Sequence, residues 1–86
     1  MKYTIDIKKR AEKFIIKLPK SEKERVLKAI YQLPEGEDIR QLKGKKNKGL
    51  LRLRVGDYRI IYSVDNGKLI VYVIDAGNRG EIYNRY

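Results

Sequence analysis

The spacing of hydrophobic residues changes period early in the chain. Tyr3, Ile5 and Ile7 alternate with polar residues, which is the period of a β-strand. From Lys8 the apolar positions follow the i, i+3, i+4, i+7 rule of an amphipathic helix. These positions are Ala11, Phe14, Ile15 and Leu18, and Pro19 comes directly after them. The pattern therefore predicts a strand over residues 3–7 and a helix that ends before Pro19.

A second helix is predicted immediately downstream. Ser21 and Glu24 have the spacing of a capping box, in which each side chain bonds a free backbone N–H at the start of a helix. The same apolar spacing then recurs at Val26, Ala29, Ile30 and Leu33, and Pro34 stops it. Because only a short link separates the two segments, we expect a helical hairpin.

The second half of the chain has the pattern of a β-meander. Residues 35–41 are polar and turn-like, and residues 43–49 form a basic loop bracketed by glycines that no hydrophobic residue anchors. Strands are predicted over 50–55, 58–64 and 68–75. The dipeptides between them, Gly56-Asp57 and Asn66-Gly67, suit two-residue hairpin turns. The pattern does not indicate a conformation for residues 77–86.

These elements give the order β-α-α-β-β-β. We expect an α+β fold in which the helical hairpin packs on an antiparallel-rich sheet. A chain of 86 residues supports one hydrophobic core, so residues 1–86 are predicted to form a single domain.

The predicted hairpin register brings arginines together. Two-residue turns place Arg54 opposite Arg59, Tyr62 opposite Val71 and Tyr58 opposite Asp75. The apolar residues then collect on one sheet face, and three arginines cluster at one end of the other. These are Arg52, Arg54 and Arg59. Like charges directly opposite each other destabilise a sheet unless an anion lies between them, which favours a phosphate-sized pocket near Arg79 and Tyr83. The alternative is a solvated face on which arginine stems cover Ile61 and Ile74.

Charge and composition narrow the function classes. The chain has 21 Lys and Arg against 11 Asp and Glu, a net charge of +10, so an anionic polymer such as nucleic acid is the expected partner. It has no Cys and no His, which excludes disulfides, thiolate and imidazole metal sites and histidine acid–base chemistry. We find no apolar run long enough for a membrane span or a secretory signal, so we expect a cytoplasmic protein without membrane contact.

Two segments resemble a known toxin family. Residues 51–62 resemble the central hairpin of RelE-type toxins, a branch of the RelE/ParE toxin superfamily, and residues 77–83 resemble their C-terminal signature. Leu42-Lys43-Gly44 before the basic loop, the order of elements and the chain length agree as well. The resemblance thus covers nearly the whole chain.

The resemblance implies a toxin held by a cognate antitoxin, and a toxin–antitoxin complex that binds operator DNA through the antitoxin. The released toxin is expected to enter the ribosomal A site and contact both messenger and ribosomal RNA. It would cleave the messenger there as an endoribonuclease, without metal or cofactor. The 2′-hydroxyl of the RNA attacks the adjacent phosphate and leaves a 2′,3′-cyclic phosphate and a 5′-hydroxyl.

The resemblance also implies roles for individual residues. By motif position, Arg59 and Arg79 are the phosphate-binding arginines and Tyr83 orients or stacks on the substrate. The expected catalytic set is Arg54, Arg59, Arg79 and Tyr83, and the expected RNA-binding set is Lys43, Lys45, Lys46, Lys48 and Arg52. The general base stays open, because a guanidinium almost never deprotonates and Asn78 stands where other members have His. Glu81 or Tyr83 could act as the general base, or the arginines could catalyse the reaction by charge neutralisation alone.

Two other functions fit the same architecture. The ParE branch shares the fold and targets DNA gyrase, but its members generally lack the arginine and tyrosine set, so the joint presence of Arg59, Arg79 and Tyr83 favours the ribonuclease. A non-catalytic RNA-binding module is the third possibility, with the basic loop and the sheet arginines only gripping phosphate.

Overall fold

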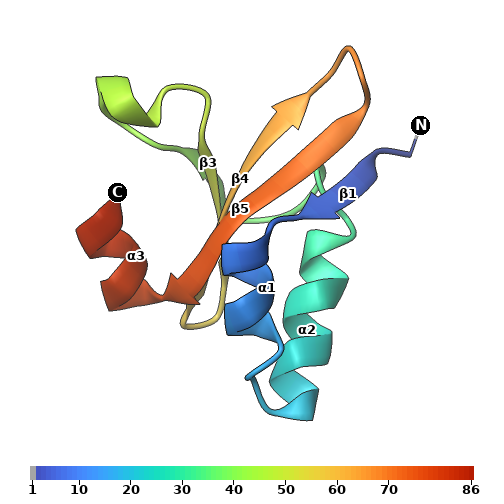
Figure 1. Ribbon diagram of the computed structural model, residues 1–86, viewed down its shortest axis with the longest axis vertical. Coiled ribbons are helices and arrows are strands. Elements are labelled where there is room, and N and C mark those ends of the chain that lie inside the picture. The colour runs from blue at the N-terminus through green and yellow to red at the C-terminus, as the bar shows by residue number, and fades with distance from the viewer. Residues whose placement is uncertain (1) are drawn as a thin grey trace.

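The computed structural model describes residues 2–86 and consists of a mixed five-stranded sheet with helices on both faces (Figure 1). The strands stand in the order β1-β5-β4-β3-β2, with β1 parallel to β5 and the other neighbours antiparallel. The elements in chain order are β1 (Thr4–Ile7), α1 (Lys9–Ile15), α2 (Lys20–Ile30), β2 (Ile39–Gln41), a 3-10 turn (Lys45–Asn47), β3 (Leu51–Val55), β4 (Tyr58–Asp65), β5 (Ile70–Asn78) and α3 (Arg79–Arg85). The α+β fold and the helical hairpin are confirmed.

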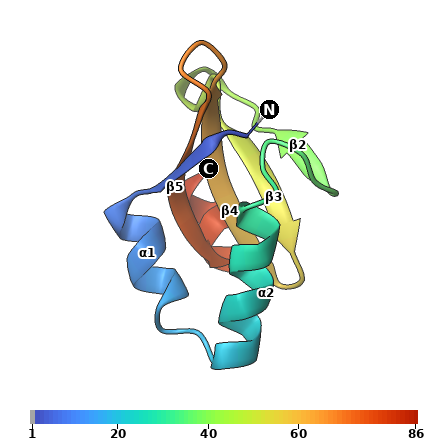
Figure 2. The same cartoon turned by 90° about the vertical axis from the view of Figure 1, so that its right-hand side faces the viewer.

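The helices α1 and α2 cover one face of the sheet, and α3 lies on the other (Figure 2). The hydrophobic core lies between the hairpin and the sheet. Its fully buried side chains include Ala11, Val26, Ile30, Ile60, Val71 and Val73. Burial of each large aliphatic side chain stabilises the fold by about 1.5–3 kcal/mol. The predicted apolar sheet face is confirmed. Leu69, which the predicted register also placed on that face, lies in a turn instead.

The start of α2 differs from the prediction. The helix begins at Lys20 with Pro19 in the cap position, and no side chain caps it. The capping box of Ser21 and Glu24 is therefore wrong. Proline fixes its own φ near the helical value and has no N–H to satisfy, so the helix starts directly after it and Ser21 falls inside the first turn.

The β3–β4 hairpin follows the predicted register. Val55 lies opposite Tyr58, and Arg54 lies opposite Arg59. Gly56 has a φ of 58°, the left-handed conformation that a two-residue turn requires and that glycine adopts without strain.

The β4–β5 hairpin does not follow it. Residues 66–69 form a four-residue turn, so Tyr62 faces Val73 and not Val71. Asp65 Oδ1 accepts the Lys68 backbone N–H at 3.0 Å, and Leu69 takes a φ of 57°. An aspartate that bonds its own backbone three residues on lengthens the turn, which dipeptide statistics do not anticipate.

A register shift between Ile61 and Tyr62 changes the pairing further along the same two strands. Tyr58 lies opposite Asn78, so the predicted pairing with Asp75 is wrong. Across the shift Asp75 pairs with Ile61, and Ala76 takes the core position beside Ile60. The bulge thereby turns Asp75 to the face that α3 covers.

Three elements were not predicted. The segment 35–41, expected to be turn-like, contains β2, which extends the sheet by a three-residue edge strand. The loop 43–49 contains a 3-10 turn, and it has a polar anchor that was not predicted, because Asn47 is only 4% exposed. The tail forms α3. None of the helices within residues 2–86 has the length and apolar character needed to cross a membrane.

Candidate functional site

A groove of about 810 Å³ lies on the sheet face opposite the helical hairpin, between β2, β3 and α3. Asp38, Arg40, Leu42, Arg52, Arg54, Arg59, Arg79, Ile82, Tyr83 and Tyr86 line it. Five arginines face one aspartate, so the lining carries a formal charge of +4. A water-accessible cavity with this charge concentrates phosphate groups.

The sheet register concentrates this charge. Arg54 pairs with Arg59 across β3 and β4, and Arg40 pairs with Arg52 across β2 and β3. All four side chains project from the same face, because opposed residues share a face and alternate residues of one strand do as well. Two adjacent like-charge pairs repel each other across the sheet, and an anion between them would relieve this repulsion.

Arg59 is the most enclosed of these cations, at 9% exposed. Its Nη1 donates to the carbonyl oxygens of Gly56 at 2.8 Å and Tyr58 at 3.0 Å, so the turn fixes one end of the guanidinium. Within residues 2–86 its Nε and Nη2 have no hydrogen-bond partner. Burial lowers the pKa of Arg59, and the neighbouring charges of Arg54, Arg52 and Arg79 lower it further. Arg59 is therefore a fixed cation with two donor groups that lack a protein acceptor.

Asp38 partly balances the arginines at the β3 end. Its Oδ1 accepts from Arg52 at 3.0 Å, and its Oδ2 lies 3.5 Å from Arg54 Nη1. Arg52 Nε is buried and has no hydrogen-bond partner in the described part of the chain. A buried donor without an acceptor costs about 1–3 kcal/mol, which an incoming oxygen ligand would offset.

The helix α3 supplies the other wall. Arg79 is its first residue, and the Arg79 backbone N–H donates to Asp57 O at 2.9 Å, which ties the start of α3 to the β3–β4 turn. Ile82 packs closely on Gly77, where an added Cβ would come within 3.3 Å of the isoleucine and force it to shift. Tyr83, one turn after Arg79, is 82% exposed. Its ring is free to stack on a base.

The structure brings together five of the residues predicted as site residues: Arg52, Arg54, Arg59, Arg79 and Tyr83. The predicted RNA-binding lysines Lys43, Lys45, Lys46 and Lys48 are exposed in the neighbouring loop and do not line the groove. Sequence reasoning missed Arg40, because it lies on the unpredicted strand β2. It also missed α3 as a wall, although Asn78 and Glu81 have the spacing of a helix cap.

Glu81 is engaged outside the groove. Its Oε1 accepts from Asn78 Nδ2 at 2.9 Å, and its Oε2 lies 3.5 Å from Arg85 Nη2. It does not line the groove. This geometry disfavours Glu81 as the general base. The remaining chemistry of the groove is multidentate binding of phosphate oxygens by guanidinium groups and neutralisation of charge that develops on them.

Comparison with known proteins assigns the family. The model described as "ParE toxin of type II toxin-antitoxin system, parDE" matches residues 5–83. The chain belongs to the RelE/ParE toxin superfamily. It is 32% identical to the mRNA interferase toxin RelE of Escherichia coli (strain K12) over 98% of this chain and 93% of that protein.

Solved structures of RelE/ParE toxins share this fold. The archaeal RelE–RelB complex from Pyrococcus horikoshii OT3 has a TM-score of 0.73 and 32% identity, covering 93% of this chain and 98% of that chain. The toxin–antitoxin complex RelBE2 of Mycobacterium tuberculosis has a TM-score of 0.80, covering 92% of this chain and 93% of that chain. At 22% identity, the second match shows the fold alone.

Proposed function

We propose that this RelE/ParE toxin is an endoribonuclease that cleaves messenger RNA in the ribosomal A site. The observation that carries the proposal is the convergence of Arg52, Arg54, Arg59, Arg79 and Tyr83 on one groove. Its relative of 32% identity is named an mRNA interferase. A bulk positive surface gives no reason for two like-charge pairs to meet at a partly enclosed cavity, whereas multidentate phosphate binding does.

In the proposed reaction the RNA supplies the nucleophile. Its 2′-oxygen attacks the adjacent phosphorus and the bond to the 5′-oxygen breaks, which leaves a 2′,3′-cyclic phosphate and a 5′-hydroxyl. Arg59 and Arg79 bind the scissile phosphate and neutralise its developing charge. Arg54 adds positive charge on the β3 side of the same phosphate. Tyr83 stacks on a flanking base and holds the nucleotide in line. Arg52 contacts the neighbouring phosphate.

The proton balance follows from the same residues. The 2′-hydroxyl must lose a proton and the 5′-oxygen must gain one. With no His in the chain and Glu81 bonded outside the groove, we assign no protein base, and solvent water takes the proton from the 2′-hydroxyl and supplies one to the 5′-oxygen. Guanidinium groups that bind the phosphate lower the barrier by stabilising charge, and the ribosome contributes alignment of the message.

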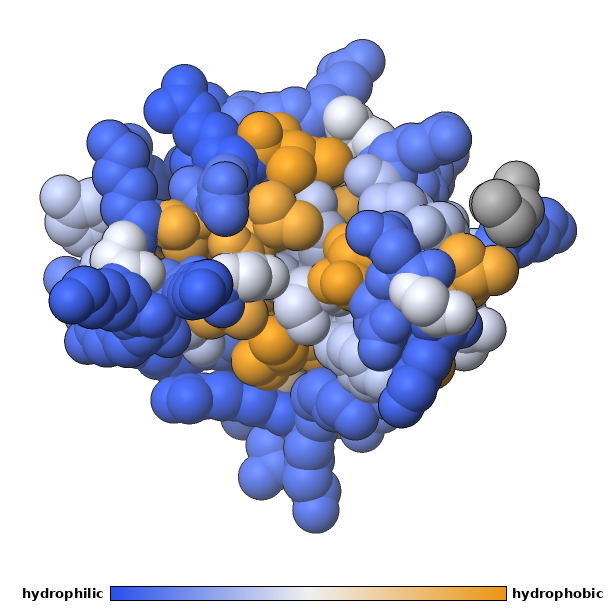
Figure 3. Space-filling model, turned by 90° about the horizontal axis from the view of Figure 1, so that it is seen from above, coloured by the Kyte–Doolittle hydropathy of each residue, from blue (hydrophilic) through white to orange (hydrophobic). Residues whose placement is uncertain are grey.

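A cognate antitoxin is the expected partner. The similar structure from Pyrococcus horikoshii OT3, at 32% identity, is a toxin–antitoxin complex. Hydrophilic side chains surround exposed hydrophobic ones on the surface seen from above (Figure 3). On the open sheet face Ile70, Tyr72 and Ile74 of β5 are partly exposed. An antitoxin segment with acidic and apolar residues would match such a surface.

The matching family is described as a ParE toxin, so the alternative to the ribonuclease is a ParE-type inhibitor of DNA gyrase. A single comparison separates the two functions. The purified chain is incubated with ribosomes translating a defined message, and in parallel with gyrase and relaxed plasmid. We expect cleavage within codons on the ribosome and unchanged supercoiling. Inhibited supercoiling with intact message would replace the ribonuclease by the gyrase inhibitor.

A further inference from the structure

The helix α3 is short, yet it carries two residues of the proposed site. Seven residues do not form a stable helix in water without outside contacts. Ile82 is the one buried side chain within it. What holds α3 against the sheet therefore decides where Arg79 and Tyr83 stand.

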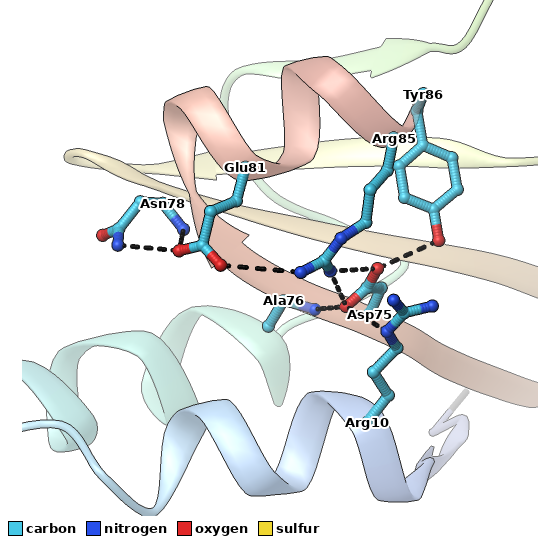
Figure 4. A network of polar contacts seen from close by, with 7 residues as sticks. All are labelled: Arg10, Asp75, Ala76, Asn78, Glu81, Arg85 and Tyr86. Carbon is cyan, nitrogen blue, oxygen red and sulfur yellow. Dashed lines mark hydrogen bonds and ion pairs between the residues drawn. The ribbon is translucent and has the colours of Figure 1, made fainter.

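Asp75 of β5 is the centre of that attachment (Figure 4). Its side chain is 0% exposed and accepts two hydrogen bonds from Arg85 Nη1, at 3.0 Å to Oδ1 and 2.9 Å to Oδ2. The Tyr86 hydroxyl donates to Oδ2 at 3.1 Å, and Arg10 Nε of α1 lies 3.8 Å from Oδ1. The backbone N–H of Ala76 donates to Oδ1 at 2.8 Å. One buried carboxylate thus joins the last turn of α3 to the sheet and to α1.

A second attachment holds the same end of α3. Asn47, in the basic loop, donates through Nδ2 to the main-chain oxygens of Lys43 at 2.9 Å and Tyr86 at 3.2 Å. Tyr86 is therefore held at its ring by Asp75 and at its backbone by Asn47. Glu81 extends the network along the helix, because it contacts both Asn78 and Arg85.

We propose that Asp75, with Asn47 as a second anchor, is the positioning residue of the groove: it holds α3 so that Arg79 and Tyr83 face Arg59. This inference rests on the proposed function for its catalytic consequence. The attachment itself is independent of that function. Asp75 does not line the groove and takes no part in the reaction. The bulge in β4–β5 pairing serves this arrangement, because it is what places Asp75 on the α3 face.

The test uses variants at the end of α3, because a change at Asp75 itself removes a buried acceptor that Arg85, Tyr86 and the Ala76 N–H share, and so threatens folding. Arg85→Ala and Tyr86→Phe each remove one partner of Asp75. Arg85→Lys keeps the charge but not the guanidinium group, which contacts Asp75 through Nη1 and Glu81 through Nη2. Asn84→Ala is the matched control, since Asn84 is exposed on the same helix and has no side-chain hydrogen bond within residues 2–86. We expect Arg85→Ala to speed amide exchange over residues 79–86 about tenfold, with exchange in β3 to β5 unchanged.

Two further measurements report position. The NMR signals of the Arg79 guanidinium and the Tyr83 ring should move in Arg85→Ala and stay in Asn84→Ala. Single-turnover cleavage at saturating ribosomes should fall about tenfold in Arg85→Ala while ribosome affinity is unchanged, and Arg85→Lys should recover part of the rate. A general loss of stability would lower both the cleavage rate and the ribosome affinity, and not the cleavage rate alone.

Unchanged exchange and unchanged Arg79 and Tyr83 signals in both Arg85→Ala and Tyr86→Phe would overturn the attachment. Faster exchange together with wild-type cleavage would overturn the positioning role. If the wild-type chain does not cleave at all, the proposed function fails, and the exchange and NMR results still decide whether Asp75 fixes α3.

Discussion

Arg54 of β3 and Arg59 of β4 lie directly opposite each other in the sheet, and Arg54 is the more exposed of the two. Asp38 reaches Arg54 at 3.5 Å, while the hydrogen bonds of Arg59 go to backbone carbonyls. The pair therefore keeps an excess of positive charge. An anion between them would be stabilised by both.

This relationship predicts a link between stability and anion binding. Arg54→Gln should raise the free energy of unfolding by about 0.5 kcal/mol in low salt, because it removes the repulsion with Arg59. Inorganic phosphate should raise the Tm of the wild type more than that of the variant, since a ligand that binds the folded state stabilises it. Thermal unfolding with and without phosphate measures both. Equal phosphate shifts in the two proteins would count against an anion site at this pair.

The sequence was sufficient for this part of the site because the β3–β4 turn is governed by local chemistry. Gly56-Asp57 closes the hairpin in two residues, so the pairing of Arg54 with Arg59 follows from counting. The helical hairpin was predictable for a similar reason, because its apolar positions recur at a fixed spacing and prolines bound both helices.

The other wall of the groove depends on interactions between distant residues. The tail carries one buried apolar side chain, Ile82, so no periodic pattern predicts α3. Its position depends on Asp75, which the β4–β5 bulge turns toward it, and on Asn47 from a loop 39 residues before Tyr86. The strand β2 is three residues long and likewise carries no pattern. Tertiary contacts, and not local propensity, create these elements.

The basic loop is predicted to grip ribosomal RNA without taking part in the chemistry. Replacing Lys45, Lys46 and Lys48 with Gln should weaken ribosome binding and flatten its salt dependence, by something under one log–log unit for each phosphate that the loop no longer binds. Asn47 is left intact so that its hydrogen bond to Tyr86 persists. Single-turnover cleavage at saturating ribosomes should stay near wild type.

The matched control replaces Lys9, Lys13 and Lys17 with Gln. These lysines lie on α1 or just after it, on the opposite side of the sheet, and the control removes the same charge from exposed positions. Equal weakening by the two triple variants would mean that only net charge matters. Normal binding without cleavage in the loop variant would instead identify a loop lysine as the proton carrier.

Cleavage is predicted to survive chelation. The chain has no His or Cys, and the proposed mechanism assigns charge neutralisation to Arg54, Arg59 and Arg79. Cleavage rates are compared with and without a chelator, while polyamines keep the ribosomes intact. A loss of activity that added Mg²⁺ restores, with ribosomes intact throughout, would refute the metal-free mechanism.

Electrostatic attraction is predicted to speed the association of the chain with its antitoxin. With a net charge of +10, the chain should associate with an acidic partner at a rate that falls as salt rises, while dissociation changes little. Stopped-flow association at low and physiological ionic strength measures this. An association rate indifferent to salt would exclude electrostatic steering.

The central claim is that Arg59 and Arg79 neutralise the scissile phosphate, and primer extension on ribosome-bound message tests it most directly. Wild type, Arg59→Ala, Arg59→Lys and the control Asn84→Ala are compared at saturating ribosomes, with end-group analysis of the products. We predict a 2′,3′-cyclic phosphate from the wild type and from Asn84→Ala, a rate about 100- to 1,000-fold lower for Arg59→Ala, and an intermediate rate for Arg59→Lys. Cleavage by Arg59→Ala at the wild-type rate would contradict the account.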